Sequence, residues 1–276
     1  MAAMASTSAM LKVSEIFESL QGEGASTGAP CVFLRLAQCN LHCSWCDTKY
    51  TWDFERYRYE DEVREQSVAE LAQLVNVAPS RRLVLTGGEP LLQQRALKEF
   101  FARLAPDIAV EVETNGTIVP EPAALSRVNQ WNVSPKLANA GDPEQFRIRP
   151  EALTMLRDSG RAYLKLVVNG DADFAEADSL VTRLSWPSDR VLLMPEAANR
   201  DQLRARSFAV AEAARKRSYR FSSRLHLELW GGRRGTKPPP SSPCQPERER
   251  NVSRPVTSFE SINRPTTPRP QGTALR

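Results

Sequence analysis

Cys39-Asn40-Leu41-His42-Cys43-Ser44-Trp45-Cys46 is a C-x3-C-x2-C run that places three thiols within eight residues. Three thiolates at this spacing can hold three irons of a cubane cluster and leave the fourth iron open. An open iron can bind a ligand and react with it, as an open coordination position does at a catalytic zinc. The run therefore indicates an iron–sulfur centre with one reactive iron.

Zinc is the alternative metal. Structural zinc sites usually take four ligands as two separated pairs, whereas Cys31 and Cys244 stand alone. The only histidines are His42 and His226. Because His42 adjoins Cys43, we do not expect His42 and Cys43 to bind the same tetrahedral metal. An electron-transfer cluster would normally need a fourth cysteine. A non-enzymatic zinc-binding protein stays open at this point.

The chain has 276 residues, enough for one sizeable domain. Residues 237–276 hold seven basic and three acidic side chains, an excess that equals the whole formal net charge of +4. Residues 1–236 are therefore neutral, so the basic composition predicts no nucleic-acid partner.

Proline enrichment and few large apolar residues predict that residues 237–276 are a disordered tail. Residues 1–9 read as a loose extension, which leaves residues 10–236 as the folded domain. No secretory signal or membrane span is apparent, so we expect a cytoplasmic protein with reduced thiols and no membrane partner.

Short apolar runs alternate with helical patterns along the folded domain. The expected strands are Val32–Leu36, Leu83–Thr86, Ala109–Glu113, Gln130–Val133, Tyr163–Val168, Val191–Met194 and Leu225–Leu229. The expected helices run from the capping box Ser67-Val68-Ala69-Glu70 toward Val77, over Leu91–Leu104 and over Asp201–Lys216. Alternation of this kind predicts an α/β fold, a partial (β/α) barrel of six or seven mostly parallel strands.

Four motifs follow successive expected strands, where reaction sites of such barrels gather. They are Thr86-Gly87-Gly88-Glu89-Pro90, Glu113-Thr114-Asn115-Gly116, Ser134-Pro135-Lys136 and Leu193-Met194-Pro195-Glu196. Each alone is ordinary turn chemistry. Together they predict one cofactor groove.

Segments on both sides of the cysteine run, and one near the end of the folded domain, carry a family resemblance. They are Phe17-Glu18-Ser19-Leu20-Gln21-Gly22-Glu23-Gly24, Gly28-Ala29-Pro30, Phe33-Leu34-Arg35, Trp45-Cys46-Asp47-Thr48 and the stretch from Leu225 to Gly235. From about Met10 to Thr236 the chain resembles the 7-carboxy-7-deazaguanine synthase family of radical S-adenosylmethionine enzymes.

The resemblance implies a 4Fe–4S cluster on Cys39, Cys43 and Cys46, with S-adenosylmethionine on its open iron. Further cofactor contacts would fall on Trp45, Cys46, Asp47, Gly88, Ser134, Pro135, Lys136, Leu193, Met194, Pro195 and Glu196. The pterin substrate would contact Leu20, Gln21, Gly22, Glu23, Arg35, Thr86 and His226. Thr48 would bind Mg²⁺, which usually keeps several waters or substrate oxygens.

The reaction implied is a ring-contracting lyase step in the 7-deazaguanine (queuosine precursor) pathway. A 5′-deoxyadenosyl radical would convert 6-carboxy-5,6,7,8-tetrahydropterin to 7-carboxy-7-deazaguanine and ammonia, with no protein base for the hydrogen abstraction. The expected partners are an electron donor such as flavodoxin or ferredoxin and a second copy of the chain in a homodimer. A glycyl-radical activase, which shares the cysteine spacing but acts on a protein, is the alternative enzyme.

Overall fold

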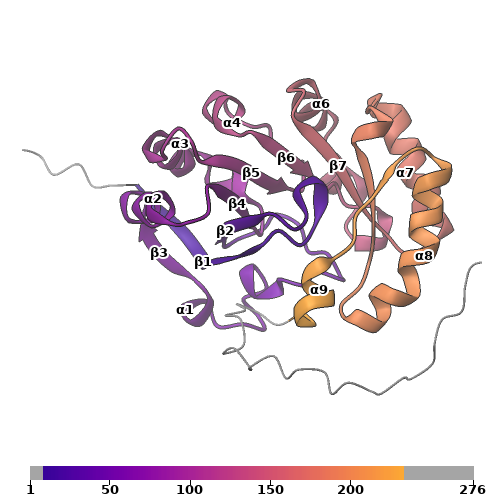
Figure 1. Cartoon of the computed structure of the whole chain (residues 1–276), viewed down its shortest axis with the longest axis horizontal. Coiled ribbons are helices and arrows are strands. Elements are labelled where there is room, and N and C mark those ends of the chain that lie inside the picture. Colours follow the sequence, from indigo (N-terminus) through magenta and orange to yellow (C-terminus); the bar gives the residue numbers. More distant parts are fainter. Residues whose placement is uncertain (1–8, 233–276) are drawn as a thin grey trace, which may run out of the picture. The chain divides into compact units, whose positions relative to one another are not determined.

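A nine-stranded sheet forms the centre of the computed structural model, which describes residues 9–232 (Figure 1). The sheet order is β3-β1-β2-β4-β5-β6-β7-β8-β9. The strands are β1 (Met10–Leu20), β2 (Pro30–Leu36), β3 (Arg64–Ser67), β4 (Arg82–Gly87), β5 (Ala109–Thr114), β6 (Gln130–Val133), β7 (Ala162–Val168), β8 (Val191–Pro195) and β9 (Arg220–Phe221). The expected tail over 237–276 and all but Ala9 of the expected N-terminal extension lie outside the described residues.

Strands β2 and β4 to β9 pair in parallel, while β1 pairs antiparallel with both β2 and β3 at one edge. Strands β3 and β9 end the order without pairing with each other, so the sheet within residues 9–232 is an open, partial barrel. This confirms the predicted fold class, but the sheet of the described residues has nine strands rather than six or seven, because β1, β3 and β9 were not predicted.

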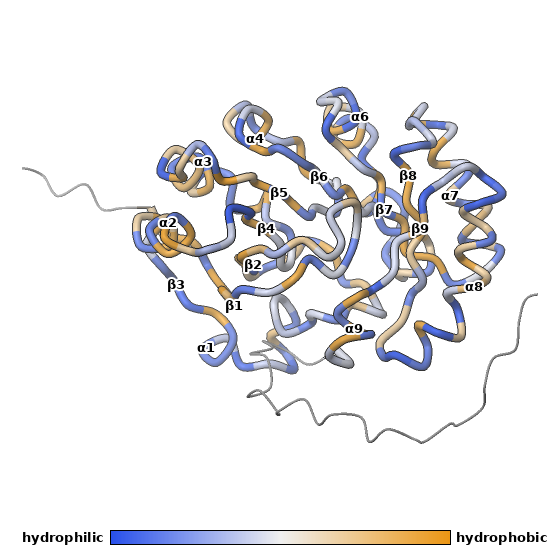
Figure 2. Tube along the Cα trace, in the orientation of Figure 1, coloured by the Kyte–Doolittle hydropathy of each residue, from blue (hydrophilic) through white to orange (hydrophobic). Residues whose placement is uncertain are grey.

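The helices are α1 (Tyr59–Glu62), α2 (Val68–Val77), α3 (Gln94–Arg103), α4 (Pro122–Arg127), α5 (Glu144–Arg147), α6 (Pro150–Asp158), α7 (Asp171–Leu184), α8 (Arg200–Lys216) and α9 (Leu225–Trp230). Helices α2, α3, α4, α6, α7 and α8 lie along the outer side of the sheet (Figure 1). Apolar residues lie on the strands and on the buried sides of helices such as α2 and α3, where they form the main core (Figure 2). No helix of residues 9–232 is long and apolar enough to cross a membrane.

Period-2 alternation along the strands separates the core from the reaction side of the sheet. On β5, Val110 and Val112 belong to the main core between sheet and helices. Glu111 and Glu113, which alternate with them, face the inside of the partial barrel. Because parallel strands end at one edge, the polar ends of neighbouring strands come together there.

The strand expected at Leu225–Leu229 is wrong, since these residues form helix α9. Alternating leucines suggested a half-buried strand, but Leu227 is the only buried residue of α9, and Gly231 ends the helix in a left-handed conformation. The last strand within residues 9–232 is instead the two-residue β9. The expected helix at Leu91–Leu104 begins as a 3₁₀ turn, η3 (Pro90–Gln93), before α3.

Candidate active site

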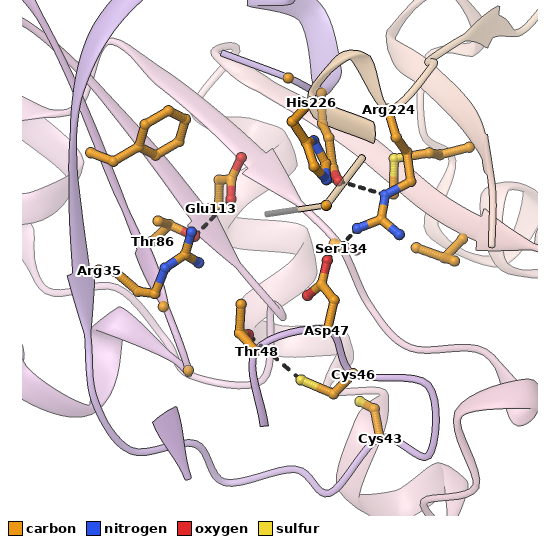
Figure 3. Close-up of a pocket in the computed structure, with 18 of the residues that line it drawn as sticks. Arg35, Cys43, Cys46, Asp47, Thr48, Thr86, Glu113, Ser134, Arg224 and His226 are labelled. Atoms are coloured by element: carbon orange, nitrogen blue, oxygen red, sulfur yellow. Dashed lines mark hydrogen bonds and ion pairs between the residues drawn. The ribbon is translucent and has the colours of Figure 1, made fainter. Parts of the chain in front are cut away.

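A cavity of about 500 Å³ lies at the carboxyl ends of the parallel strands. The cysteines lie at one end of it, Arg35, Thr86 and Glu113 on one wall, and Arg224 on another (Figure 3). The lining includes these residues expected from the sequence: Leu20, Gln21, Gly22, Glu23, Arg35, Cys39, Cys43, Trp45, Cys46, Asp47, Thr48, Thr86, Gly88, Ser134, Lys136, Met194, Glu196 and His226. One cavity thus joins segments from across the sequence.

Three expected contact residues do not line this cavity. They are Pro135, Leu193 and Pro195. Leu193 is fully buried in the main core, and its carbonyl accepts a hydrogen bond from the backbone N–H of Ser222. Each of the three adjoins at least one residue that does line the cavity: Ser134, Lys136, Met194 or Glu196.

The cysteine loop folds into a small apolar cluster of its own. Cys43 packs there with Leu41 and Ala140, and Cys39 and Cys46 lie against the same cluster. Burial raises the pKa of the Cys39 thiol to about 12 and that of the Cys43 thiol to about 11. Both are therefore protonated near neutral pH until a metal displaces the proton.

Two glycines at the end of β4, Gly87 and Gly88, hold the start of the cysteine loop against the sheet. A Cβ on Gly88 would lie 1.9 Å from the carbonyl oxygen of Gln38, and a Cβ on Gly87 would lie 2.0 Å from that of Leu36. The backbone N–H of Gly88 donates to Leu36 O at 3.0 Å. Only glycine permits this contact, which sets the position of Cys39.

Glu89 completes this junction from a fully buried position. Its carboxylate accepts hydrogen bonds from the Leu91 N–H at 3.0 Å, the Asn115 N–H at 2.7 Å and the Thr114 hydroxyl at 2.9 and 3.0 Å. Burial raises the pKa of Glu89 in spite of these donors. The residue ties the ends of β4 and β5 together rather than facing the cavity, since it is absent from the lining.

Arg35 presents an unused pair of donors to the cavity. Its Nε donates to Glu15 Oε2 at 2.9 Å, and the Tyr50 hydroxyl donates to the same oxygen at 2.8 Å. Among the described residues, its two terminal nitrogens have no hydrogen-bond partner, and the guanidinium carbon lies 6.0 Å from the centre of the Phe17 ring. A planar fork held in this way can bind a carboxylate bidentately.

Glu113 forms the acceptor side of the same wall. Thr86 Oγ1 donates to Glu113 Oε2 at 2.7 Å, and Gln21 Nε2 donates to Glu113 Oε1 at 3.2 Å (Figure 3). Gln21 Nε2 also donates to the buried Glu111 at 2.8 Å, so its amide is held from two sides. Each Glu113 oxygen keeps capacity for a further donor.

Glu23 and Asp47 are joined through one guanidinium. Arg224 Nε donates to Glu23 Oε1 at 2.9 Å, and Arg224 Nη2 pairs with Asp47 (Figure 3). Lys165 pairs with the other oxygen of Glu23. Burial opposes ionisation of Glu23, but Lys165, Arg224 and His226 outweigh it and hold its pKa well below the usual value. Burial also opposes ionisation of Asp47, but Arg224, Arg35 and His226 together outweigh it and lower the pKa of this carboxyl.

His226 lies over the loop that follows β1. A Cβ on Gly22 would lie 2.5 Å from His226 Nδ1, and the Leu225 N–H donates to Gly22 O at 2.8 Å. Burial lowers the pKa of His226, although Glu23 works in the opposite direction. The imidazole is therefore neutral near pH 7 and can both donate and accept a hydrogen bond.

Ligand atoms of Glu23, Asp47 and His226 lie within 4.8 Å of one another, close enough to share a cation. Arg224 already pairs with both carboxylates, and Lys165 with one of them. The two cations neutralise the two carboxylates, so these three side chains alone do not favour a divalent metal.

Trp52, Glu113, Lys165 and Arg224 line the cavity but were not predicted as site residues. Lys165 carried a signal in the sequence, because a charged residue interrupts an apolar strand, and Glu113 stood at a strand end. Arg224 is far from Glu23 and Asp47 in the sequence, so no local sequence pattern predicts their pairing.

Comparison with known proteins yields one consistent family. Residues 35–135 match the Radical SAM superfamily. The chain is 38% identical to a 7-carboxy-7-deazaguanine synthase of Pyrobaculum aerophilum, over 82% of this chain and 97% of that protein. It is 36% identical to one of Hyperthermus butylicus, over 79% and 92%. The crystal structure of QueE from Escherichia coli aligns with a TM-score of 0.60 and 26% identity, over 79% of this chain and 95% of that one.

Proposed function

The chain belongs to the 7-carboxy-7-deazaguanine synthase family of radical S-adenosylmethionine enzymes, and we propose that it converts 6-carboxy-5,6,7,8-tetrahydropterin to 7-carboxy-7-deazaguanine and ammonia. The observation that carries this proposal is one cavity that joins the three cysteines to a wall formed by Arg35, Thr86 and Glu113. A glycyl-radical activase or a zinc scaffold would not need such a wall.

Membership of the superfamily implies a 4Fe–4S cluster and S-adenosylmethionine. The residues fit the cluster, because three thiols from one loop lie in an apolar cluster beside the cavity. Cys39, Cys43 and Cys46 would hold it as thiolates. When bound, cluster and cofactor supply the one-electron chemistry that removes a hydrogen atom from a C–H bond of the substrate.

The wall formed by Arg35, Thr86 and Glu113 would position the substrate. The terminal nitrogens of Arg35 would bind its carboxylate, since no described residue occupies them. Glu113 would accept hydrogen bonds from the guanine-like N–H groups of the pterin, with Thr86 and Gln21 fixing its carboxylate. Neutral His226 and the loop from Leu20 to Glu23 would complete the contact.

The cofactor would lie on the strand-end residues nearest the cysteines. Lys136 Nζ lies 5.5 Å from the Trp45 ring centre and donates to Ser134 Oγ at 3.1 Å, so these three residues already form one surface. Gly88, Asp47 and the segment from Leu193 to Glu196 are the other proposed contacts, together with Pro135. All of them except Pro135, Leu193 and Pro195 line the cavity.

Mg²⁺ is part of the proposal through Thr48. The Thr48 hydroxyl lies beside the cavity, 3.6 Å from Cys46 Sγ. Hydroxyl, substrate carboxylate and water oxygens are suitable hard ligands for this ion. A pterin substrate, a flavodoxin or ferredoxin as electron donor, a homodimer and a cytoplasmic location complete the proposal.

The test is anaerobic turnover of the reconstituted protein with carboxytetrahydropterin, S-adenosylmethionine, Mg²⁺ and a low-potential reductant. We expect 7-carboxy-7-deazaguanine, many products per S-adenosylmethionine, and loss of both cluster and product in Cys43→Ala. Cys31→Ala is the matched control, because Cys31 is buried in a separate cluster with Phe33 and Val84. A fully loaded cluster that makes no such product would overturn the substrate assignment.

A further inference from the structure

An indole N–H points at one of the three sulfurs of the cysteine loop. Trp52 Nε1 donates to Cys46 Sγ at 3.4 Å. The Trp52 ring is partly buried and lines the same cavity as the cysteines. The indole therefore donates a hydrogen bond to a proposed cluster ligand, and Trp52 is not among the site residues expected from the sequence.

Trp52 is held through its backbone and through its ring. The Trp52 backbone N–H donates to Lys49 O at 3.0 Å, closing the turn η2 (Lys49–Thr51). The His42 ring meets the Trp52 ring edge-on, with 5.0 Å between their centres and an angle of 67°. Both Lys49 and His42 flank Cys46 in the chain, so the donor and the sulfur belong to one folded unit.

We propose that Trp52 tunes the reduction potential of the 4Fe–4S cluster by donating its indole N–H to Cys46. The inference rests on the proposed function only in requiring a cluster on the three cysteines. Reduction adds one electron and no proton, so the reduced cluster carries one more negative charge. A hydrogen bond to a ligand sulfur stabilises that charge, and hydrogen bonds to the sulfurs are among the factors that set cluster potentials. Trp52 thus makes the cluster easier to reduce.

Trp52→Phe is the direct test, because it keeps an aromatic ring against His42 and removes only the N–H donor and the outer part of the indole. In an EPR-monitored redox titration without substrate, we expect the equilibrium constant for reduction of the cluster to fall about tenfold. For a one-electron couple this makes the reduction potential about 59 mV more negative. The titration reads only the loaded fraction, so lower iron content does not alter the result, and failure of pterin turnover would leave it standing.

Trp186→Phe is the matched control. Its indole nitrogen is buried without a hydrogen-bond partner in the described part of the chain, and Trp186 does not line the cavity. We expect an unchanged potential in this variant. Equal potentials for the wild type and Trp52→Phe would overturn the proposal.

A second measurement uses the wild-type protein alone. With ¹⁵N in the tryptophan indoles, pulsed EPR of the reduced cluster should show a coupling from one indole nitrogen. Trp45 Nε1 donates to Asn139 Oδ1 at 3.1 Å instead of to a sulfur, so the strongest coupling should come from Trp52. A reduced cluster without any indole coupling would also contradict the proposed contact.

Discussion

Arg224 donates from Nε to Oε1 of Glu23 at 2.9 Å and so joins the start of α9 to the loop that follows β1. The same guanidinium pairs with Asp47 beside the cysteines and with the carbonyl of Ala197 after β8. Three segments that are far apart in the sequence therefore meet at one buried side chain. This arrangement links the proposed substrate loop to the proposed cofactor loop.

Arg224→Ala should destabilise the protein by about 3 kcal/mol, because it leaves a buried carboxylate short of one partner. Urea unfolding of the metal-free protein measures the change. Arg215→Ala is the control, since Arg215 and Glu212 form an exposed pair, and pairs of this kind contribute about 0–1 kcal/mol. Equal losses in the two variants would show that the Arg224 pair carries no special weight.

The pH dependence of stability should reveal Glu23. Its pKa in the folded protein lies well below the usual 4.5, because Lys165, Arg224 and His226 outweigh the effect of burial. The unfolded chain therefore binds the proton first as pH falls. The stabilisation from Glu23 should be complete above about pH 5 and should be lost as pH falls through the folded-state pKa.

Comparison of wild type with Glu23→Gln between pH 7 and pH 3 tests this expectation. The difference in free energy of unfolding should shrink once the pH falls below the usual value of about 4.5. A difference that stays constant across the acid range would mean that Glu23 is not held ionised by its neighbours.

Gly88→Ala should disturb the cysteine loop. The new Cβ would lie 1.9 Å from the backbone oxygen of Gln38, so the chain before Cys39 must move. We expect lower iron and sulfide content after anaerobic reconstitution. Gly170→Ala is the control, since nothing lies within 4 Å of a Cβ there and its φ of −179° is extended. Full iron loading in Gly88→Ala would refute the steric argument.

Arg35→Lys should weaken substrate use while leaving cluster loading intact. A lysine keeps the charge but replaces the planar fork with a single ammonium. We expect kcat/KM for carboxytetrahydropterin to fall on the order of tenfold to a hundredfold, as for loss of one hydrogen bond to a charged group. Arg183→Lys, in an exposed pair with Glu144, should have no effect. An unchanged kcat/KM in Arg35→Lys would remove Arg35 from carboxylate binding.

The sequence predicts the parallel strands well because each is a short run in which apolar residues are continuous or alternate with single polar ones. Strands β2 and β4 to β8 are buried by helices, and their β-branched runs stand out from the polar segments between them. Strand β1 (Met10–Leu20) mixes charged and apolar residues, and its pairing with β2 decides its conformation. Helix α9 was missed because five residues with alternating leucines cannot distinguish a strand from a short helix.

Some site residues can likewise be predicted from local sequence and others cannot. Cys39, Cys43 and Cys46 are close in sequence, so their spacing alone predicts a metal centre. Lys165 and Arg224 act on Glu23 across 142 and 201 positions, and only the closed fold brings them together. Long-range charge pairs are set by packing, which no local pattern encodes.

The shared cavity is tested most directly with carboxytetrahydropterin that carries deuterium at C6. If substrate and S-adenosylmethionine lie side by side in this cavity, the hydrogen taken from C6 returns to the product by way of the cofactor. We predict that S-adenosylmethionine recovered after several turnovers carries deuterium at its 5′ carbon. Formation of 7-carboxy-7-deazaguanine with S-adenosylmethionine that stays free of deuterium would contradict the shared site.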